Sequence, residues 1–240
     1  LTIKEGYPKS INEVFPGIQE NIDAVFTWNK DNTTYFFKDK FVYKYDDKNR
    51  KVAIGYPRNI VDRFPGAPEK LDAIFSDLIN NKTYIIRANE LWVLKDDSSI
   101  ETGYPIPINN SDNGFPGLGV TPIVNSYYTT GNINSELYFF GGMGGNYYYT
   151  YGTKLSDPND LQKTFKNIPP NFDYLVTDDK NNQVYFFNGN RVYLYDSNKY
   201  KYIDSKNIND ILIGIPPSCN AGYKYNDDIY YFFKGNYVYK

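Results

Sequence analysis

Hydrophobic residues along this chain come in short runs that polar turns separate. Near the N-terminus, an apolar run at 22–26 precedes an aromatic run at 34–38, and residues 41–45 alternate between apolar and polar side chains. Runs of this length between Asn- and Asp-rich turns are typical of antiparallel strands. The pattern therefore predicts three short strands and a fourth at 51–54. One or two helical turns are predicted within 58–63, where the following Pro-Gly ends them.

The same pattern returns along the chain. An aromatic or apolar triplet recurs with a period of about 49 residues, beginning at positions 35, 84, 138, 185 and 231. An apolar run with an aspartate in second place precedes the first two triplets, at 22–26 and 71–75, and weaker copies precede the others. A third marker is Gly-Tyr-Pro followed by Phe-Pro-Gly, found at 6–8 with 15–17, 55–57 with 64–66, and 103–105 with 115–117. Three markers that share one period indicate an internal repeat.

Four complete repeats occupy about 21–70, 71–120, 121–170 and 171–219. Residues 220–240 supply the first three strands of another repeat, and residues 1–20 supply a last strand and helix. Four short strands and a brief helix per repeat predict an all-β fold, a β-propeller in which residues 1–240 form one domain. The two partial repeats would combine into a fifth blade and close the ring without an open edge strand. The alternative is a four-bladed propeller plus a partial repeat.

These markers, in this order, resemble the hemopexin repeat. The match is sharpest at 22–66 and 71–117, weaker at 121–170 and 171–217, and resumes at 220–240 with Tyr-Phe-Phe-Lys-Gly. In that family, four such repeats form a propeller around a central channel, and a cysteine pair usually joins the first blade to the last. The resemblance places one member of such a pair at Cys219. The sequence has no second cysteine, so a buried or unreactive thiol is the alternative.

Composition excludes most familiar enzyme chemistry. The chain has no histidine and one cysteine, which removes histidine-based triads, histidine-ligated metals and cysteine zinc sites. A net charge of −2 offers no basic surface for nucleic acid, and no apolar run is long enough for a transmembrane segment. The chain begins at Leu1, so we expect a processed or excised product of a longer protein.

The resemblance also implies an ion site. In hemopexin-like propellers, main-chain carbonyls at the Asp-Ala positions surround the channel and hold a structural calcium or sodium ion, as oxygen ligands suit such cations. The matching residues are Asp23, Asp72, Asp173 and Asn220, and the third repeat has Pro122 there. The alternative is that these aspartates cap the inner strands and hydrogen-bond neighbouring blades.

Two further motifs could carry chemistry but are predicted to form turns. Paired aspartates occur at 46–47, 96–97, 178–179 and 227–228. Two carboxylates held across a cleft can hydrolyse a glycosidic bond, but these pairs fall in polar turns, where aspartate bonds the local backbone. The glycine-rich segment 141–146 lacks the lysine and hydroxyl of a phosphate-binding loop and joins two predicted strands. It is therefore predicted to be a hairpin turn.

Tyrosines cluster at 127–128, 147–151 and 193–202, where alternation would bury one set and expose the other. Exposed tyrosines offer rigid contact area to proteins or sugars, and packing between blades is the alternative. Haem binding is not expected, because tyrosinate is the only strong ligand left and Met143 stands alone.

The sequence thus predicts a non-catalytic binding module rather than an enzyme, one that recognises a protein or glycan partner. The resemblance implies a secreted or extracellular protein and, in a bacterium, a toxin-associated one. The alternative function is a carrier of haem or a polyamine that uses the central channel. Fold alone does not decide between these functions.

Overall fold

The computed structural model describes residues 3–28, 30–77, 82–110, 112, 114, 124–129, 137–141, 147–151, 159–170, 172–178, 180–219, 221–226 and 229–240. The chain divides into two compact units. The N-terminal unit is Ser10–Pro116, and the C-terminal unit combines Leu1–Lys9 with Gly117–Lys240. A single domain that spans residues 1–240 stays a prediction.

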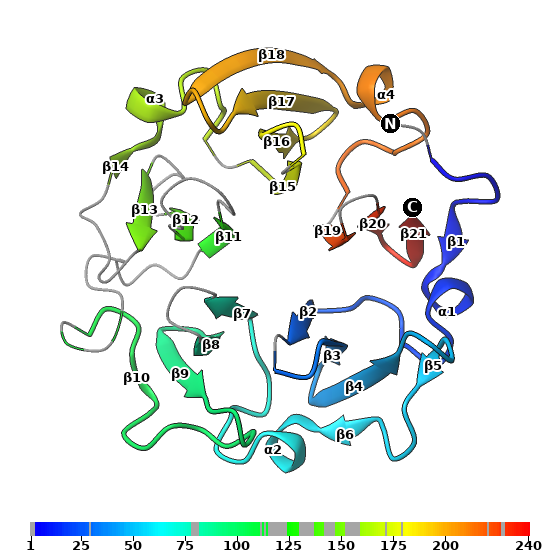
Figure 1. Ribbon diagram of the computed structural model, residues 1–240, viewed down its shortest axis with the longest axis vertical. Coiled ribbons are helices and arrows are strands. Elements are labelled where there is room, and N and C mark those ends of the chain that lie inside the picture. The colour runs from blue at the N-terminus through cyan, green and yellow to red at the C-terminus, as the bar shows by residue number, and fades with distance from the viewer. Residues whose placement is uncertain are drawn as a thin grey trace. The chain divides into compact units, whose positions relative to one another are not determined.

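The described strands of the N-terminal unit form two antiparallel sheets (Figure 1). The first sheet has the order β2 (Ala24–Trp28), β3 (Thr33–Lys38), β4 (Phe41–Asp46) and β5 (Lys51–Val52), with β6 (Arg58–Asn59) also paired to β4. The second has the order β10 (Ile106–Pro107), β9 (Glu90–Leu94), β8 (Lys82–Arg87) and β7 (Ala73–Asp77). The first strands of the two sheets, β2 and β7, lie side by side.

The described strands of the C-terminal unit form three antiparallel sheets. Two of them follow the chain: β11 (Val124–Thr129), β12 (Leu137–Gly141), β13 (Tyr147–Tyr151) and β14 (Asn159–Asp160), then β15 (Tyr174–Asp178), β16 (Gln183–Asn188), β17 (Arg191–Asp196) and β18 (Lys201–Asn207). The third has the order β1 (Lys9–Ser10), β21 (Tyr237–Tyr239), β20 (Ile229–Lys234) and β19 (Ala221–Asn226). The strand that begins the second of these sheets, β15, lies beside both β11 of the first sheet and β19 of the third.

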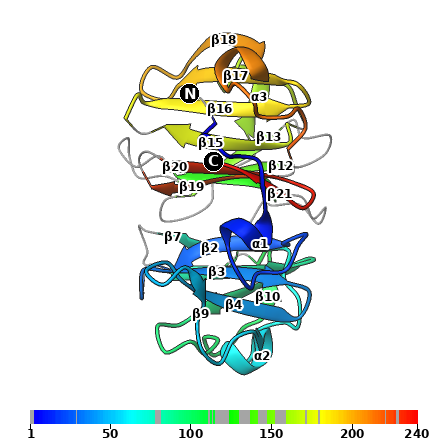
Figure 2. The same cartoon turned by 90° about the vertical axis from the view of Figure 1, so that its right-hand side faces the viewer.

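The two ends of the chain therefore share one sheet, as the partial repeats predict. The N–H of Lys4 also donates to the carbonyl of Lys240, at 2.8 Å. Figure 2 shows β21 beside β20 and β19, with α1 (Ile11–Val14) after β1. The all-β class and the antiparallel sheets are confirmed, whereas closure into a ring of five blades is not.

The first three predicted strands of each repeat are found close to their expected positions, but the fourth differs. In the first repeat β5 ends at Val52, the Ala53 N–H still donates to the Lys44 carbonyl of β4 at 2.8 Å, and the chain leaves the sheet at 54–57 before it returns as β6. Gly55 has a φ of 84° and Pro57 has no N–H to give β4, so this segment cannot continue the strand. In the fourth repeat, which lacks Gly-Tyr-Pro, β18 is continuous and carries Ile203 as the extra residue of a bulge.

A four-residue helix follows the fourth strand in four places. The helices are α1, α2 (Ile60–Arg63), α3 (Leu161–Thr164) and α4 (Ile208–Ile211), so α2 lies within the predicted span 58–63. A large apolar residue comes directly after each helix and is buried, namely Phe15, Phe64, Phe165 and Leu212. None of the helices in the described part of the chain is long and apolar enough to cross a membrane.

These apolar residues fasten each helix to the core of a sheet. The Phe15 ring lies 5.0 Å from that of Phe36 and 5.4 Å from that of Tyr45. The Phe165 ring makes the matching contacts, 5.8 Å from Phe186 and 4.9 Å from Tyr195. Buried aromatic pairs of this kind contribute about 1 kcal/mol each beyond the area that they bury. The repeat of the sequence is thus a repeat of packing.

Candidate functional site

Asp23, Asp72 and Asp173 occupy the same place in three sheets, directly before the first strand. The N–H of each donates to the carbonyl of the last triplet residue of its own sheet, at 2.9, 2.9 and 2.7 Å. This backbone pairing gives the three residues one register, as the repeat predicts. Asn220 and Pro122, at the matching places in two other repeats, lie outside the described residues.

The carboxylates of these aspartates hold the turn between the second and third strands. Each accepts the backbone N–H of the residue sixteen positions later, at 2.6, 2.7 and 2.8 Å, from Asp39, Ala88 and Gly189. The φ angles of these turn residues are 51°, 50° and 58°. The left-handed conformation is strained for residues other than glycine, so the charged acceptor offsets part of its cost.

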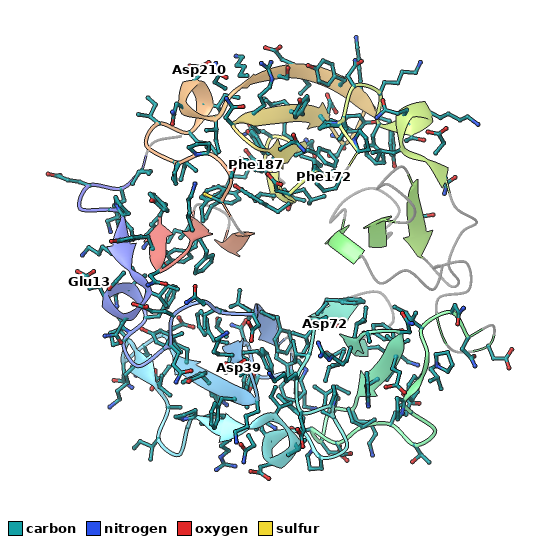
Figure 3. The ribbon with its side chains drawn as sticks, turned by 180° about the vertical axis from the view of Figure 1, so that it is seen from behind. Glu13, Asp39, Asp72, Phe172, Phe187 and Asp210 are labelled. Carbon is teal, nitrogen blue, oxygen red and sulfur yellow. The ribbon has the colours of Figure 1, made fainter. Side chains whose placement is uncertain are left out.

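A cation pairs with two of the three carboxylates. The ammonium of Lys38 lies 3.2 Å from Asp23, and this hydrogen bond raises the pKa of Lys38. The Arg87 guanidinium pairs with Asp72, which is labelled in Figure 3. The prediction that these aspartates cap strands is confirmed. Each described contact of these carboxylates stays within one sheet, and bonds to neighbouring blades stay a prediction.

The main-chain carbonyls, rather than the carboxylates, are the expected ion ligands. Asp23 and Asp72 precede strands that lie side by side, β2 and β7, and Asp173 precedes β15 beside β19. Within the described ranges, side chains of Asp, Glu and Cys form no group of three that could hold a metal ion. Carbonyl ligation at these residues stays a prediction.

Three of the paired aspartates, Asp46, Asp97 and Asp178, serve turns, whereas Asp96 pairs with the Lys30 ammonium at 2.9 Å. Asp46 accepts the N–H of Asn49 at 2.9 Å, and Asp97 accepts that of Ser99 at 2.9 Å. Asp178 accepts the side-chain amide of Asn181 at 2.8 Å. Hydrogen bonds from Ser99 lower the pKa of Asp97 to about 2, which marks a stabilised carboxylate rather than a general acid. Residues 179, 227 and 228 lie outside the described ranges.

Other predicted motifs are mostly structural. Gly141 ends β12 and Tyr147 begins β13, so the glycine-rich segment joins two strands, but 142–146, and Met143 with them, lie outside the described residues. Among the tyrosines of 193–202, Tyr195 is buried, while Tyr200 is 41% exposed. Tyr193 and Tyr202 pack against a buried cluster around Phe186. Cys219 is buried, as the alternative for the unpaired thiol predicts.

One cluster in the first sheet was not anticipated from the sequence. The Arg63 guanidinium of α2 lies over the rings of Phe64, Trp28 and Tyr35, at 4.6, 5.4 and 5.5 Å from their centroids. One of its N–H groups donates to the Tyr35 hydroxyl, at 3.1 Å. That hydroxyl donates to Asp31 at 2.8 Å. We call this group of side chains the arginine cage.

Hydrogen bonds within the arginine cage favour the charged forms of Arg63 and Asp31. Burial acts to lower the pKa of Arg63, but the hydrogen bonds that its guanidinium donates to the Tyr35 and Tyr56 hydroxyls prevail and raise it. Asp31 also accepts the Lys44 ammonium at 2.9 Å, and these contacts outweigh burial and lower the pKa of Asp31. The sequence held one signal for the cage: the helix position of Arg63 carries Val14, Thr164 and Ile211 in the other repeats.

Comparison with known sequences identifies the repeat. The family model described as Hemopexin matches residues 22–69 and 176–217. Interstitial collagenases from Equus caballus and Sus scrofa are each 47% identical to this chain over 47 residues, which is 20% of the chain. The matched segment spans only 10% of either collagenase.

Comparison with solved structures concerns the fold alone. A plant lectin with two metal binding sites from Cicer arietinum has a TM-score of 0.50 and 18% identity, over 79% of this chain and 94% of the lectin. The hemopexin fold protein CP4 from cow pea has a TM-score of 0.49 and 22% identity, over 70% of this chain and 84% of CP4. With the repeated strands, turns and helices described above, the family match shows that the chain carries hemopexin-like repeats at residues 22–69 and 176–217.

Proposed function

We propose that this chain is a non-catalytic binding module whose outer loops and strands recognise a protein partner. The observation that carries the proposal is a set of large apolar side chains left exposed on the described surface, namely Ile54 (94%), Ile213 (61%), Tyr237 (53%), Ile203 (46%), Tyr200 (41%) and Val61 (38%). Of the paired aspartates, Asp46, Asp97 and Asp178 are hydrogen-bonded within turns and Asp96 pairs with Lys30. This use of the carboxylates supports binding over hydrolysis.

A protein partner is favoured over a glycan because four of the six side chains are aliphatic. Aliphatic groups gain free energy when another protein covers them, whereas a hydrated sugar covers them poorly. A glycan is the second candidate, since Tyr200 and Tyr237 present rings that a sugar face can cover.

Binding is tested with the whole chain as bait against a displayed peptide library and a glycan array. We expect the selection to enrich peptides that bind the parent chain more tightly than they bind a chain with either single substitution, Ile54→Ser or Ile213→Ser. Glycan binding alone would replace the protein partner with the second candidate. Absence of both, or release of reducing sugar from an array glycan, would overturn the binding-module proposal.

We also propose that the five sheets are the blades of one ring. The sheet shared by β1 and β21 supports this arrangement, because the two chain ends together complete a four-stranded sheet. The alternative is a four-bladed ring with one sheet outside it. End-on averages by electron microscopy should show five-fold pseudo-symmetry, and four-fold averages would establish the alternative.

A calcium or sodium ion at the main-chain carbonyls of Asp23, Asp72, Asp173 and Asn220 is a further proposal. It is supported by the common register of the first three residues, whose carboxylates are already engaged in turns. Calcium added to metal-free protein should raise the melting temperature in a saturable manner, and sodium chloride should do so relative to choline chloride. Equal melting temperatures without metal, with calcium, with sodium chloride and with choline chloride would overturn the ion-site proposal.

A further inference from the structure

The guanidinium of Arg63 has N–H groups that donate to no carboxylate among the described residues. Arg63 has five N–H groups, of which one donates to the Tyr35 hydroxyl, and the Tyr56 hydroxyl also interacts with the guanidinium. Among the residues that the structure describes, no carboxylate lies within 4.0 Å of it. A half-buried guanidinium in this state is able to bind an anion in the bidentate manner that arginine favours.

A second arginine, Arg58, lies over the Tyr56 ring. The Arg58 guanidinium carbon is 5.3 Å from the centre of the Tyr56 ring, and its Nε donates to the carbonyl of Gly55 at 3.1 Å. Arg58 is exposed and likewise has no carboxylate within salt-bridge distance in the described chain. Tyr56 therefore joins two arginines whose positive charges are not balanced by a direct partner.

The fold itself does not require this concentration of charge. The helix position of Arg63 carries the uncharged residues Val14, Thr164 and Ile211 in the other repeats, and those helices still pack on their sheets. Apolar side chains flank the two arginines within the same short segment, with Ile54 94% exposed and Val61 38% exposed. Arginine, tyrosine and exposed aliphatic groups together form the composition of a protein interface.

We infer that residues 54–63, the arginine segment, dock an acidic stretch of a protein partner. A carboxylate of the partner pairs with Arg58 and Arg63, and neighbouring apolar side chains cover Ile54. Charge complementarity selects this partner, because the exposed Arg58 and the half-buried Arg63 have no described carboxylate within salt-bridge distance, while the segment's own carboxylate, Asp62, accepts the Asn59 side chain. The inference rests on the proposed binding function and assigns that function to one surface.

The test is selection from a random peptide library displayed on phage, with the whole chain as bait. Parallel baits carry Arg58→Gln, Arg63→Val or the matched control Arg191→Gln. Arg63→Val installs the residue that the N-terminal partial repeat has at this position, Val14. Among the described residues, the Arg191 side chain hydrogen-bonds only Ser205, so Arg191→Gln removes one positive charge in the C-terminal unit instead. Circular dichroism and melting temperature check that each bait is folded.

We expect peptides that combine Asp or Glu with apolar residues and that bind each of the first two variants at least about tenfold more weakly, with the control unchanged. Replacement of each acidic residue of a selected peptide by its amide should reproduce the loss. Selected peptides that bind all four baits equally would overturn the inference and leave the binding function standing. If no acidic peptide is selected, and heparin binds the parent chain but not the Arg58→Gln and Arg63→Val variants, the partner would instead be a sulfated glycan and the inference would be overturned.

If neither peptides nor glycans bind any bait, the proposed function fails together with this inference. Arg58 is exposed, so Arg58→Gln remains a usable bait even if Arg63→Val does not fold.

Discussion

Asp23, Asp72 and Asp173 each accept a backbone N–H from a turn residue whose φ is positive. The spacing of sixteen residues between acceptor and donor is the same in all three sheets. The turn between the second and third strands is thereby bonded to the start of the first strand, which lies beside the end of the second. At the scale of single residues, the recurring aspartate is explained by this hydrogen bond.

Asp173→Ala should destabilise the C-terminal unit by about 1 kcal/mol, because it removes a charged acceptor for the Gly189 N–H from an exposed site. Asp173→Asn keeps an acceptor oxygen and should lose less. Urea unfolding followed by circular dichroism measures both free energies. Equal losses in the two variants would contradict the role of this hydrogen bond.

Cys219 should react slowly with iodoacetamide in the folded chain. The residue is 3% exposed, and burial raises the pKa of its thiol to about 11, against a partial lowering by Tyr174. At pH 8 the thiolate fraction is then about 100-fold smaller than in an unfolded chain. Mass spectrometry should show labelling at least that much slower in buffer than in concentrated urea, and similar rates would contradict the burial.

The same thiol should make stability depend on alkaline pH. Below pH 9 the thiol is protonated in folded and unfolded chains alike, so its contribution is fully present. As pH rises from 9 towards 11, only the unfolded chain loses the proton, and the free energy of unfolding falls. Cys219→Ala should remove this part of the decline in urea titrations at each pH, and parallel curves for both proteins would contradict it.

At the scale of elements, each four-residue helix depends on its ends more than on its length. Helices this short are not stable alone, so caps and packing hold them. Ser10 and Glu13 of α1 form a reciprocal capping box, at 3.2 Å and 2.7 Å. Asn59 precedes α2 in the same place but makes no such cap, since its side chain bonds Asp62.

Ser10→Ala should therefore cost about 1 kcal/mol of stability in the N-terminal unit, because the Glu13 N–H loses its acceptor. Asn59→Ala should cost clearly less, since no cap is lost at α2. The comparison is made by urea unfolding of both variants and the parent chain. A larger loss for Asn59→Ala would show that packing, rather than capping, sets the stability of these helices.

At the scale of the whole molecule, the two chain ends depend on each other. β1 adds to the edge of β21, and Lys4 donates to the last carbonyl of the chain. Ile3 packs against a buried cluster of the C-terminal unit and lies close to Gly214, so the first residues anchor more than their own strand. Without them, β21 would be an exposed edge.

A chain that lacks residues 1–9 should show at least about tenfold faster hydrogen exchange at the amides of β21, because they lose their neighbouring strand and the contacts of Ile3. Amides of β16, in the interior of another sheet, serve as the internal reference. Hydrogen exchange with mass spectrometry reads both segments. Unchanged exchange in β21 would contradict the stabilising role of the N-terminal segment.

Local spacing determined the parts of this protein that the sequence predicts well. Triplets, turns and helix stops recur at a fixed period, because strand pairing and hairpin turns engage residues a few positions apart. The strands 24–28, 33–38 and 41–46 and the helix 60–63 accordingly lie close to their predicted positions. The turn role of Asp46 and Asp97 also follows from local hydrogen bonds.

Contacts between distant residues were decided by the tertiary structure alone. Gly-Tyr-Pro leaves the sheet in the first repeat because Gly55 and Pro57 cannot pair with β4, which hydrophobic alternation does not reveal. Arg63 gains its environment from Trp28 and Tyr35, about 30 residues earlier, and a helix pattern contains no such information. The sequence by itself therefore determined the repeated element and its internal bonds. The cage and the two arginines beside Tyr56 arise only when folding brings separate strands and a helix together.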